Sequence, residues 1–316
     1  MQRPLLTSQR MQRPLLTSPI TLMRVSDALR TARLSFQIVG AVVFGSSATG
    51  RATASSDLDL LVVARGIPPK RHRRTREVVQ IKRVLPDIPV DVLLMTPEEA
   101  QSNFANHNPL FLDLAEDGIL VLDEDGSLAR AIQETRQDIR RGGIERTEHG
   151  WRFPVEPGVV TYLSTVSNRD FSLGMLKDAE RDQKIGEVLA GSGFFDKAVY
   201  HFQQAAEKAV KAMLIAVGVF QKTHLVGATL RRVAAESRIS DRWRHPLLEA
   251  AGISDELEPE VSLSRYPGII EGTLWLPSEE YTGEDAAAAG TKATKVLAIA
   301  HAFVEDWFGG SAPAHA

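Results

Sequence analysis

The sequence predicts an α+β domain with a small mixed sheet, followed by an all-α helical bundle. In the first half of the chain, short apolar runs such as Leu60-Leu61-Val62-Val63 alternate with helical patterns. From Asp170 onward the apolar residues recur with helical spacing. Residues 144–157, between these two regions, contain Gly, Pro and aromatic residues in a pattern typical of a hairpin or an extended linker.

The change in pattern predicts four parts along the chain. A chain of 316 residues is longer than most single cores, so two domains are expected. We place the α+β domain at 21–143, a linker or hairpin at 144–165 and the helical domain at 166–310. Residues 1–8, MQRPLLTS, are repeated word for word at 11–18, with Met11 or Met23 as an alternative start. We expect residues 1–20 to form a disordered arm.

The composition excludes several classes of protein. The chain has no cysteine, and therefore no disulfide, thiolate metal site or cysteine nucleophile, which favours a cytoplasmic location. No apolar run approaches the ~20 residues that span a bilayer, and the N-terminus lacks the apolar core of a signal peptide. The net charge is −3, and neither half is as basic as a dedicated nucleic-acid binder.

Each element of the first domain follows from a local pattern. A strand containing Val43-Phe44 leads into a Gly45-Ser46 turn, and a second strand carries Asp57 and Asp59. Helical spacing and the stop signals Pro86 and Gly142-Gly143 define the rest. We expect a helix at about 70–85, a strand at 88–94, helices at 97–105 and 108–117, a strand at 119–123 and a helix at 127–141.

The second domain reads as a series of helices. Apolar residues at helical spacing predict helices at 170–190, 196–217, 226–237, 244–256 and 284–307. The helix at 196–217 carries an apolar stripe, and its other side carries Gln203, Gln204, Glu207 and Lys208. Two interpretations of these four residues stay open, a domain interface and plain surface. The basic segment 70–76 is likewise either a steering patch for polyanions or the solvated start of a helix.

Paired carboxylates mark the candidate site. Side-chain alternation puts Asp57 and Asp59 on the same face, where they repel each other unless a cation lies between them. Mg²⁺ suits such oxygen ligands where phosphates are also bound. Gly45 permits a close backbone approach, and the Ser46 hydroxyl can bond phosphate oxygens. Asp91 stands in another strand-like apolar run, which a metal site would explain. Each motif alone has an ordinary alternative, a common loop or an exposed strand end.

The constellation resembles the minimal nucleotidyltransferases of the DNA polymerase β-like superfamily over roughly residues 22–125. The resemblance implies that Gly45 and Ser46 hold the nucleotide triphosphate and that Asp57 and Asp59 ligate Mg²⁺. It also implies that Asp91 completes the metal site and helps to deprotonate an acceptor hydroxyl. Family members often read G-S-x-A-R-G, whereas here Arg51, the candidate phosphate contact, stands two positions later.

The second domain resembles the HEPN family over roughly 167–308. The resemblance lies in residues 195–209, in Thr223-His224 and in Ser264-Arg265-Tyr266-Pro267. Many HEPN domains are ribonucleases that use an Arg followed closely by a His, but here Lys295 stands six residues before His301. Because a Lys cannot brace a phosphate bidentately, we do not expect RNA cleavage. HEPN domains commonly pair, so we expect a homodimer through the helix at 196–217.

Together the two resemblances imply a Mg²⁺-dependent enzyme. It would transfer a nucleotidyl group, AMP from ATP as the first candidate, to a hydroxyl of a protein or small-molecule acceptor. The alternative is a toxin–antitoxin-type regulatory protein in which the HEPN half is an RNA-binding or RNase-like interaction module. The sequence does not name the acceptor or the preferred nucleotide, and it predicts no membrane partner.

Overall fold

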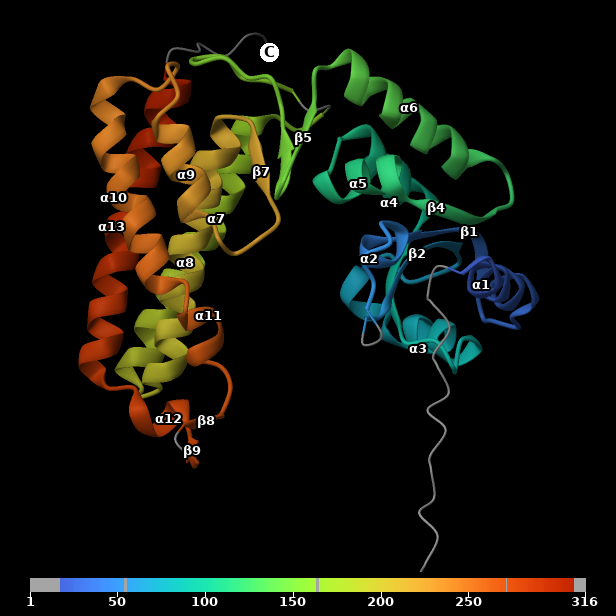
Figure 1. Cartoon of the computed structure of the whole chain (residues 1–316), viewed down its shortest axis with the longest axis horizontal. Coiled ribbons are helices and arrows are strands. Elements are labelled where there is room, and N and C mark those ends of the chain that lie inside the picture. The colour runs from blue at the N-terminus through green and yellow to red at the C-terminus, as the bar shows by residue number, and fades with distance from the viewer. Residues whose placement is uncertain (1–17, 54–55, 163–164, 271, 310–316) are drawn as a thin grey trace, which may run out of the picture. The chain divides into compact units, whose positions relative to one another are not determined.

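The computed structural model describes residues 18–53, 56–162, 165–270 and 272–309 (Figure 1). The chain forms two compact units, an N-terminal unit to Arg141 and a C-terminal unit from Gly142. Among the described residues, no helix combines the length and the apolar character needed to cross a membrane.

The N-terminal unit is a four-stranded sheet covered by helices on both faces. Its strands are β1 (Gln37–Phe44), β2 (Leu58–Arg65), β3 (Val90–Met95) and β4 (Ile119–Asp123). Its helices are α1 (Pro19–Thr31), α2 (Gly45–Ala48), α3 (Thr75–Val84), α4 (Pro97–Ala105), α5 (Pro109–Asp117) and α6 (Ser127–Arg141), with a 3₁₀ turn at Arg71–Arg73.

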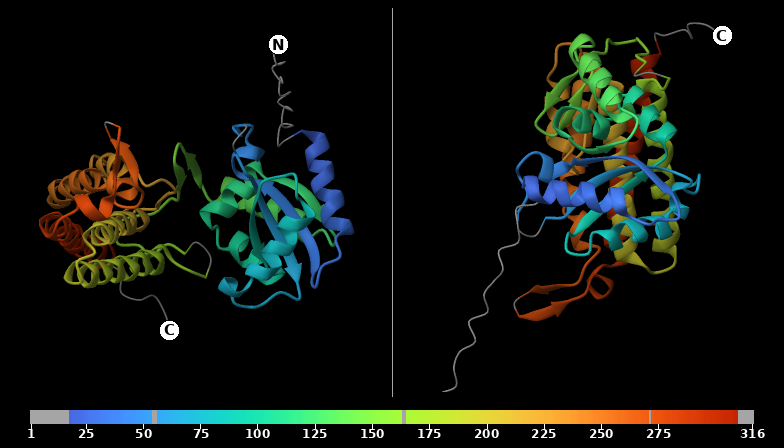
Figure 2. Two further views of the ribbon diagram at one scale, coloured as in Figure 1. Left: turned by 90° about the horizontal axis from the view of Figure 1, so that it is seen from below. Right: turned by 90° about the vertical axis from the view of Figure 1, so that its right-hand side faces the viewer.

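The sheet is mixed, as the sequence predicts. The strand order is β3-β2-β1-β4, with β2 and β3 parallel and β1 antiparallel to both β2 and β4. Alternation puts Val43 and Leu60 in the core formed with α1 and α3, and the neighbouring Val42 and Leu61 are buried on the other face. The α4 and α5 helices contact β2 and β1. Figure 2 shows the sheet between these helices.

Helix α1 includes residues 19 and 20, which were expected to belong to the N-terminal arm. The Ser18 hydroxyl accepts a hydrogen bond from the Thr21 backbone N–H and caps α1, which begins at Pro19. Val25 and Leu29 of α1 are buried against the sheet. Residues 1–17, which include the first copy of the repeat and most of the second, lie outside the described residues.

The basic segment 70–76 is not only a solvated helix start. Arg74 is 2% exposed, and its guanidinium forms a bidentate ion pair with Glu99, with N···O distances of 2.6 and 3.0 Å. Its remaining bonds go to the backbone carbonyls of Pro68, Pro69 and Leu94. Arg74 therefore ties the loop before α3 to the end of β3 and to the start of α4.

The C-terminal unit is a helical bundle with two small sheets. Its long helices are α7 (Asn168–Gly191), α8 (Phe195–Ala216), α10 (Asp241–Leu257) and α13 (Gly283–Phe308). Its shorter helices are α9 (Gly227–Ala234), α11 (Glu260–Leu263) and α12 (Pro277–Glu280). Its strands are β5 (Glu145–Thr147), β6 (Gly150–Arg152), β7 (Val219–Gln221), β8 (Gly268–Ile270) and β9 (Thr273–Trp275).

Helix α8 is the centre of the bundle. It packs against α7, α10 and α13, and most of its side chains are buried (Figure 1). Gln203 and Glu207 are only 3% and 4% exposed, so they are neither plain surface nor a free interface. Most α8 side chains that the expected dimer surface would use are buried within the bundle itself, and the homodimer stays a prediction.

The segment expected as a hairpin or linker forms a hairpin and becomes part of a larger sheet. β6 pairs with β5 and also with β7, which lies about 70 residues later, in the order β5-β6-β7. Trp151 is 1% exposed, and Phe153 packs edge-on against Phe220 with ring centroids 5.0 Å apart. This sheet anchors the residues after Gly142 to the helical bundle.

A second hairpin, β8–β9, was not predicted from the sequence. It stands out from the end of the bundle in Figures 1 and 2. Ile269 and Leu274 are cross-strand partners, and they are 80% and 64% exposed.

Candidate active site

The Gly45-Ser46 segment begins a short helix, where the sequence predicts a turn. β1 ends at Phe44, and Gly45 follows with φ +69° as the first residue of α2. The Thr49 hydroxyl closes this helix by donating to the carbonyl oxygens of Gly45 and Ser46, at 3.2 and 3.3 Å. A Cβ on residue 45 would lie 2.0 Å from Asp59 Oδ2. Residue 45 must therefore be glycine, both for its backbone angle and for the space that Asp59 occupies.

Asp59 is the central carboxylate of the candidate site. It lies opposite Phe44 in the antiparallel β1–β2 pair and opposite Asp91 in the parallel β2–β3 pair. Burial raises the pKa of Asp59, and the negative charges of Asp91 and Asp57 raise it further. A hydrogen bond from the Ser46 backbone N–H opposes this rise. The structure therefore brings Asp59 together with Gly45, Ser46, Asp57 and Asp91.

The two flanking carboxylates are exposed. Asp57 comes one residue before β2, and Asp91 is the second residue of β3. In the sequence Asp91 stands in an apolar run, but alternation buries its neighbour Val90 and turns Asp91 to solvent, so its position does not by itself require a metal ion. The Leu58 N–H donates to the Pro89 carbonyl at 2.8 Å and holds the starts of both strands together.

Arg51 follows α2 and is exposed. Its backbone N–H donates to the Ser46 carbonyl oxygen at 2.9 Å. The backbone contact keeps residue 51 next to the Gly45-Ser46 segment, although the arginine stands two positions later than in the family pattern.

The carboxylates suit a hard cation without forming a complete cage. Within the part of the chain that the structure describes, no three His, Cys, Asp or Glu side chains are arranged to hold a metal ion. Mg²⁺ does not need such a cage, because it is usually bound by one or two carboxylates together with waters and substrate phosphates. The repulsion that Asp57 and Asp91 impose on Asp59 is what a divalent cation would relieve. The donor set therefore fits the ion.

The C-terminal unit contains a polar network around the buried Glu207 that sequence reasoning did not resolve. Glu207 accepts hydrogen bonds from Gln203 at 3.0 Å and from Lys211 at 2.8 Å. Both of its carboxylate oxygens lie 3.0 Å from Nδ1 of His224. The available signal was the pair Thr223-His224, which lies far from Glu207 in the sequence, so only the fold joins them. The network explains why α8 tolerates polar residues at buried positions.

Lys295 and His301, which occupy the positions of the ribonuclease pattern, each pair with a glutamate instead. His301 Nε2 lies 2.9 Å from Glu180 Oε1, and Lys295 Nζ lies 2.5 Å from Glu249 Oε1. Arg238, which stands seven residues before His245, bonds to Glu236 and to the carbonyls of Val155 and Val217.

Solved structures and known proteins resemble parts of this chain. The structure of TT1696 from Thermus thermophilus is 22% identical over a region that covers 42% of this chain and 97% of the TT1696 chain, with a TM-score of 0.34. A nucleotidyltransferase-like protein from Exiguobacterium sibiricum 255-15 is 15% identical, covers 78% of this chain and 83% of its own, and gives a TM-score of 0.32. A protein of Methanocaldococcus jannaschii named "Putative toxin MJ1304" is 38% identical over 134 residues, which are 42% of this chain and 88% of the relative.

Two protein families match consecutive parts of the chain. Residues 22–111 match the family described as nucleotidyltransferase domain, and they contain Gly45, Ser46, Asp57, Asp59 and Asp91. Residues 174–304 match the family described as HEPN domain. The chain therefore belongs to the proteins that join an N-terminal nucleotidyltransferase domain to a C-terminal HEPN domain.

Proposed function

We propose that the N-terminal unit transfers a nucleotidyl group, with ATP as the first candidate donor, to a hydroxyl of a protein or small-molecule acceptor. The observation that carries this proposal is the position of Asp59, which contacts the Gly45-Ser46 segment and is influenced by the charges of Asp57 and Asp91. In this reaction the acceptor oxygen forms a bond to the α-phosphorus, and the bond from that phosphorus to the leaving pyrophosphate breaks. The matched nucleotidyltransferase family supports the reaction class.

Each residue of the site has a proposed role. Asp57 and Asp59 would hold Mg²⁺ together with waters and phosphate oxygens, with Asp91 beside them, and the ion neutralises phosphate charge when it is bound. Gly45 and Ser46 would bind the triphosphate through the backbone and the Ser46 hydroxyl, and Arg51 would add a positive charge beside them. Asp91, which is exposed, would accept the proton of the acceptor hydroxyl.

Calorimetry with ATP and MgCl₂ tests the proposal. The double variant Asp57→Ala/Asp59→Ala should lose measurable binding while its circular dichroism is unchanged. Asp87→Ala is the matched control, because Asp87 is an exposed acid of the same unit in a surface ion pair with Arg24. Equal affinity in the double variant and the wild type would show that these carboxylates do not hold the nucleotide. Labelled ATP with a panel of acceptors, including the protein itself, then identifies the acceptor.

A second function is favoured by one comparison. The relative named "Putative toxin MJ1304" is 38% identical to this chain over 134 residues, which are 42% of the chain. The alternative is therefore a toxin–antitoxin-type regulatory protein in which the HEPN half is an RNA-binding or RNase-like interaction module. RNA cleavage and nucleotide transfer measured in the wild type, Asp59→Ala and His301→Ala separate the two. We expect Asp59→Ala to abolish transfer and His301→Ala to leave it unchanged. Cleavage that survives Asp59→Ala and disappears in His301→Ala would favour the alternative.

A further inference from the structure

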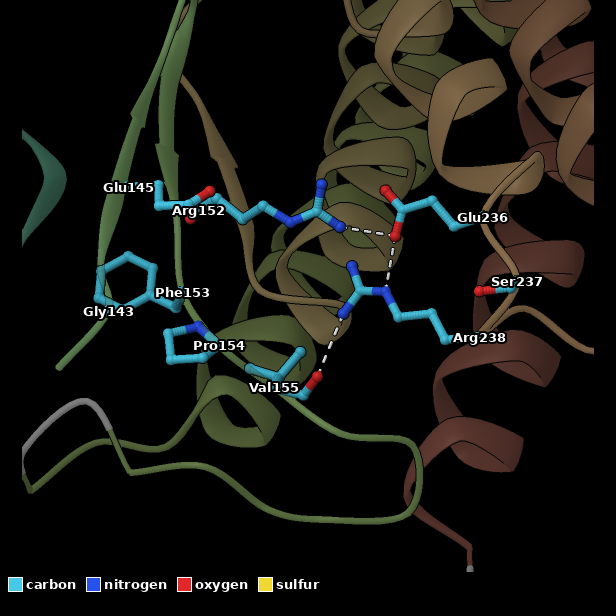
Figure 3. Close-up of a pocket in the computed structure, with 9 residues that line it drawn as sticks. All are labelled: Gly143, Glu145, Arg152, Phe153, Pro154, Val155, Glu236, Ser237 and Arg238. Carbon is cyan, nitrogen blue, oxygen red and sulfur yellow. Dashed lines mark hydrogen bonds and ion pairs between the residues drawn. The ribbon is translucent and has the colours of Figure 1, made fainter.

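A cavity of about 470 Å³ opens in the C-terminal unit. Arg152 at the end of β6, and Glu236 and Arg238 from the segment that connects α9 to α10, line it (Figure 3). Phe153, Pro154 and Val155 line it as well, and of these Pro154 supplies the exposed apolar surface, because Phe153 and Val155 are buried. The cavity therefore combines charged groups and an apolar surface, which is the usual make-up of a small-molecule site.

The charged groups are unequal in number. Arg152 Nη2 and Arg238 Nε both donate to the same atom, Oε2 of Glu236, and each distance is 2.6 Å (Figure 3). Two guanidinium charges thus share one partly buried carboxylate. Glu145 also lines the cavity, but it is exposed to solvent. The interior of the cavity has an excess of positive charge, which a second anion would balance.

The two arginines differ in what else they bond. Arg238 donates to the backbone carbonyls of Val155 at 3.2 Å and of Val217 at 2.9 Å, and its guanidinium lies over the Trp307 ring at 5.9 Å. Its position is therefore fixed by the bundle. The side chain of Arg152 is 37% exposed, and Glu236 is the one hydrogen-bond partner that the structure records for it among the described residues. Arg152 consequently retains N–H groups that can bond a ligand.

A second cavity, of about 250 Å³, lies next to the same ion pair. It shares Arg152 and Glu236 with the first cavity and adds His149 and Arg232. Its other carboxylate, Glu148, is 78% exposed and lies 3.7 Å from His149. Basic groups therefore stand on both sides of Glu236, and an anion in the larger cavity would meet no further buried carboxylate among the lining residues.

We infer that the larger cavity binds a small organic phosphate. Arg152 would donate to the phosphate oxygens through its planar fork, which matches phosphate geometry. The exposed Ser237 hydroxyl, which also lines the cavity, can donate as well. The exposed ring of Pro154 would contact the organic part of the ligand. This site lies in the helical unit and is independent of the function proposed for Asp59.

Calorimetry with phenyl phosphate at constant ionic strength tests the inference on the full chain. The wild type should bind, and Arg152→Gln should bind at least 10-fold more weakly with unchanged circular dichroism. Arg152→Lys keeps the charge but loses the fork, and it should fall between them. Arg181→Gln removes an exposed arginine of the same unit and should bind like the wild type. Equal affinity in Arg152→Gln and the wild type would overturn the inference.

Further experiments locate the binding site and identify the kind of ligand that it takes. Arg51→Gln should leave phenyl phosphate binding unchanged, whereas loss of binding in that variant would place the ligand in the N-terminal unit and refute the assignment. Inorganic phosphate should bind more weakly than phenyl phosphate, because it does not contact the Pro154 ring. Benzyl alcohol should not bind, and binding as tight as that of phenyl phosphate would show that the charge excess plays no part. Slower hydrogen exchange at 142–155 and 236–238 with phenyl phosphate would support the location, and exchange unchanged there would contradict it.

Discussion

Replacing Gly45 with alanine tests whether this residue keeps Asp59 in place, and Gly50→Ala is its matched control. The two glycines have nearly the same backbone angle, φ +69° and +71°. Alanine at either position therefore carries the same left-handed penalty, about 1–2 kcal/mol of folding free energy. The surroundings differ, because a Cβ on residue 50 would meet nothing within 4 Å, whereas a Cβ on residue 45 would lie 2.0 Å from Asp59 Oδ2.

The size of the effect follows from that distance. Non-bonded atoms rest at about 3.5 Å, so the Asp59 carboxylate must retreat by roughly 1.5 Å in Gly45→Ala. A misplacement of about 1 Å can cost on the order of 10²-fold in rate. We therefore expect Gly45→Ala to lose at least as much stability as Gly50→Ala, and only Gly45→Ala to lose on the order of 10²-fold in nucleotidyl transfer.

Three measurements separate the effects of the substitutions on stability, on nucleotide affinity and on the transfer rate. Urea unfolding of the two variants compares the backbone penalty, and calorimetry with ATP and MgCl₂ compares ligand affinity. Labelled-ATP transfer compares the chemical step. The same nucleotide affinity and transfer rate in Gly45→Ala and Gly50→Ala would refute the reasoning, because the contact with Asp59 would then have no functional effect.

Three further predictions concern stability and assembly. Arg74→Met should destabilise the protein by about 1–3 kcal/mol in urea unfolding, because the backbone carbonyls that Arg74 bonds lose their donor while Glu99 keeps Arg71 as a partner, whereas the exposed Arg73→Met should change stability by less than about 0.5 kcal/mol. Burial opposes the charge of Glu207, but bonds from Lys211, Gln203 and His224 outweigh it and lower the pKa of Glu207. The stabilisation from the Glu207 carboxylate is complete above the unfolded pKa of about 4.3, and it is lost as the pH falls through the lower folded pKa. The urea midpoint of Glu207→Gln should therefore lie below that of the wild type at pH 7, and this difference should be smaller at pH 3. Light scattering should give the mass of a homodimer at micromolar concentration, and a monomer mass would contradict this expectation.

The sequence predicted most regular elements because their signals are local. The expected strand at 119–123 and helix at 127–141 coincide with β4 and α6, since a clear periodicity ends at Gly142-Gly143. β7, β8 and β9 each have only three residues, which is too short for an alternating pattern to be recognised. β7 also depends on pairing with β6, which no local signal indicates.

The candidate site was predictable only in part, for a similar reason. The spacing of Asp57 and Asp59 and the Gly45-Ser46 segment are local features of the sequence. The hydrogen bond from the Ser46 N–H to Asp59, and the exposure of Asp91, depend on how β1, β2 and β3 align. The burial of Arg74 and of Glu207 likewise depends on partners in other elements. Charged residues on a helix are usually solvated, and only tertiary packing decides when they are not.

The β5-β6-β7 sheet has a practical consequence for any attempt to study the HEPN half alone. The match to the HEPN family begins at residue 174, and a fragment cut there would lack β5 and β6. β7 would then present an unpaired backbone edge, and the Phe220 ring would lose its contact with Phe153. Open edges of this kind recruit strands from other molecules. A fragment that begins at Gly142 retains the three strands, whereas one cut at the family boundary is expected to aggregate.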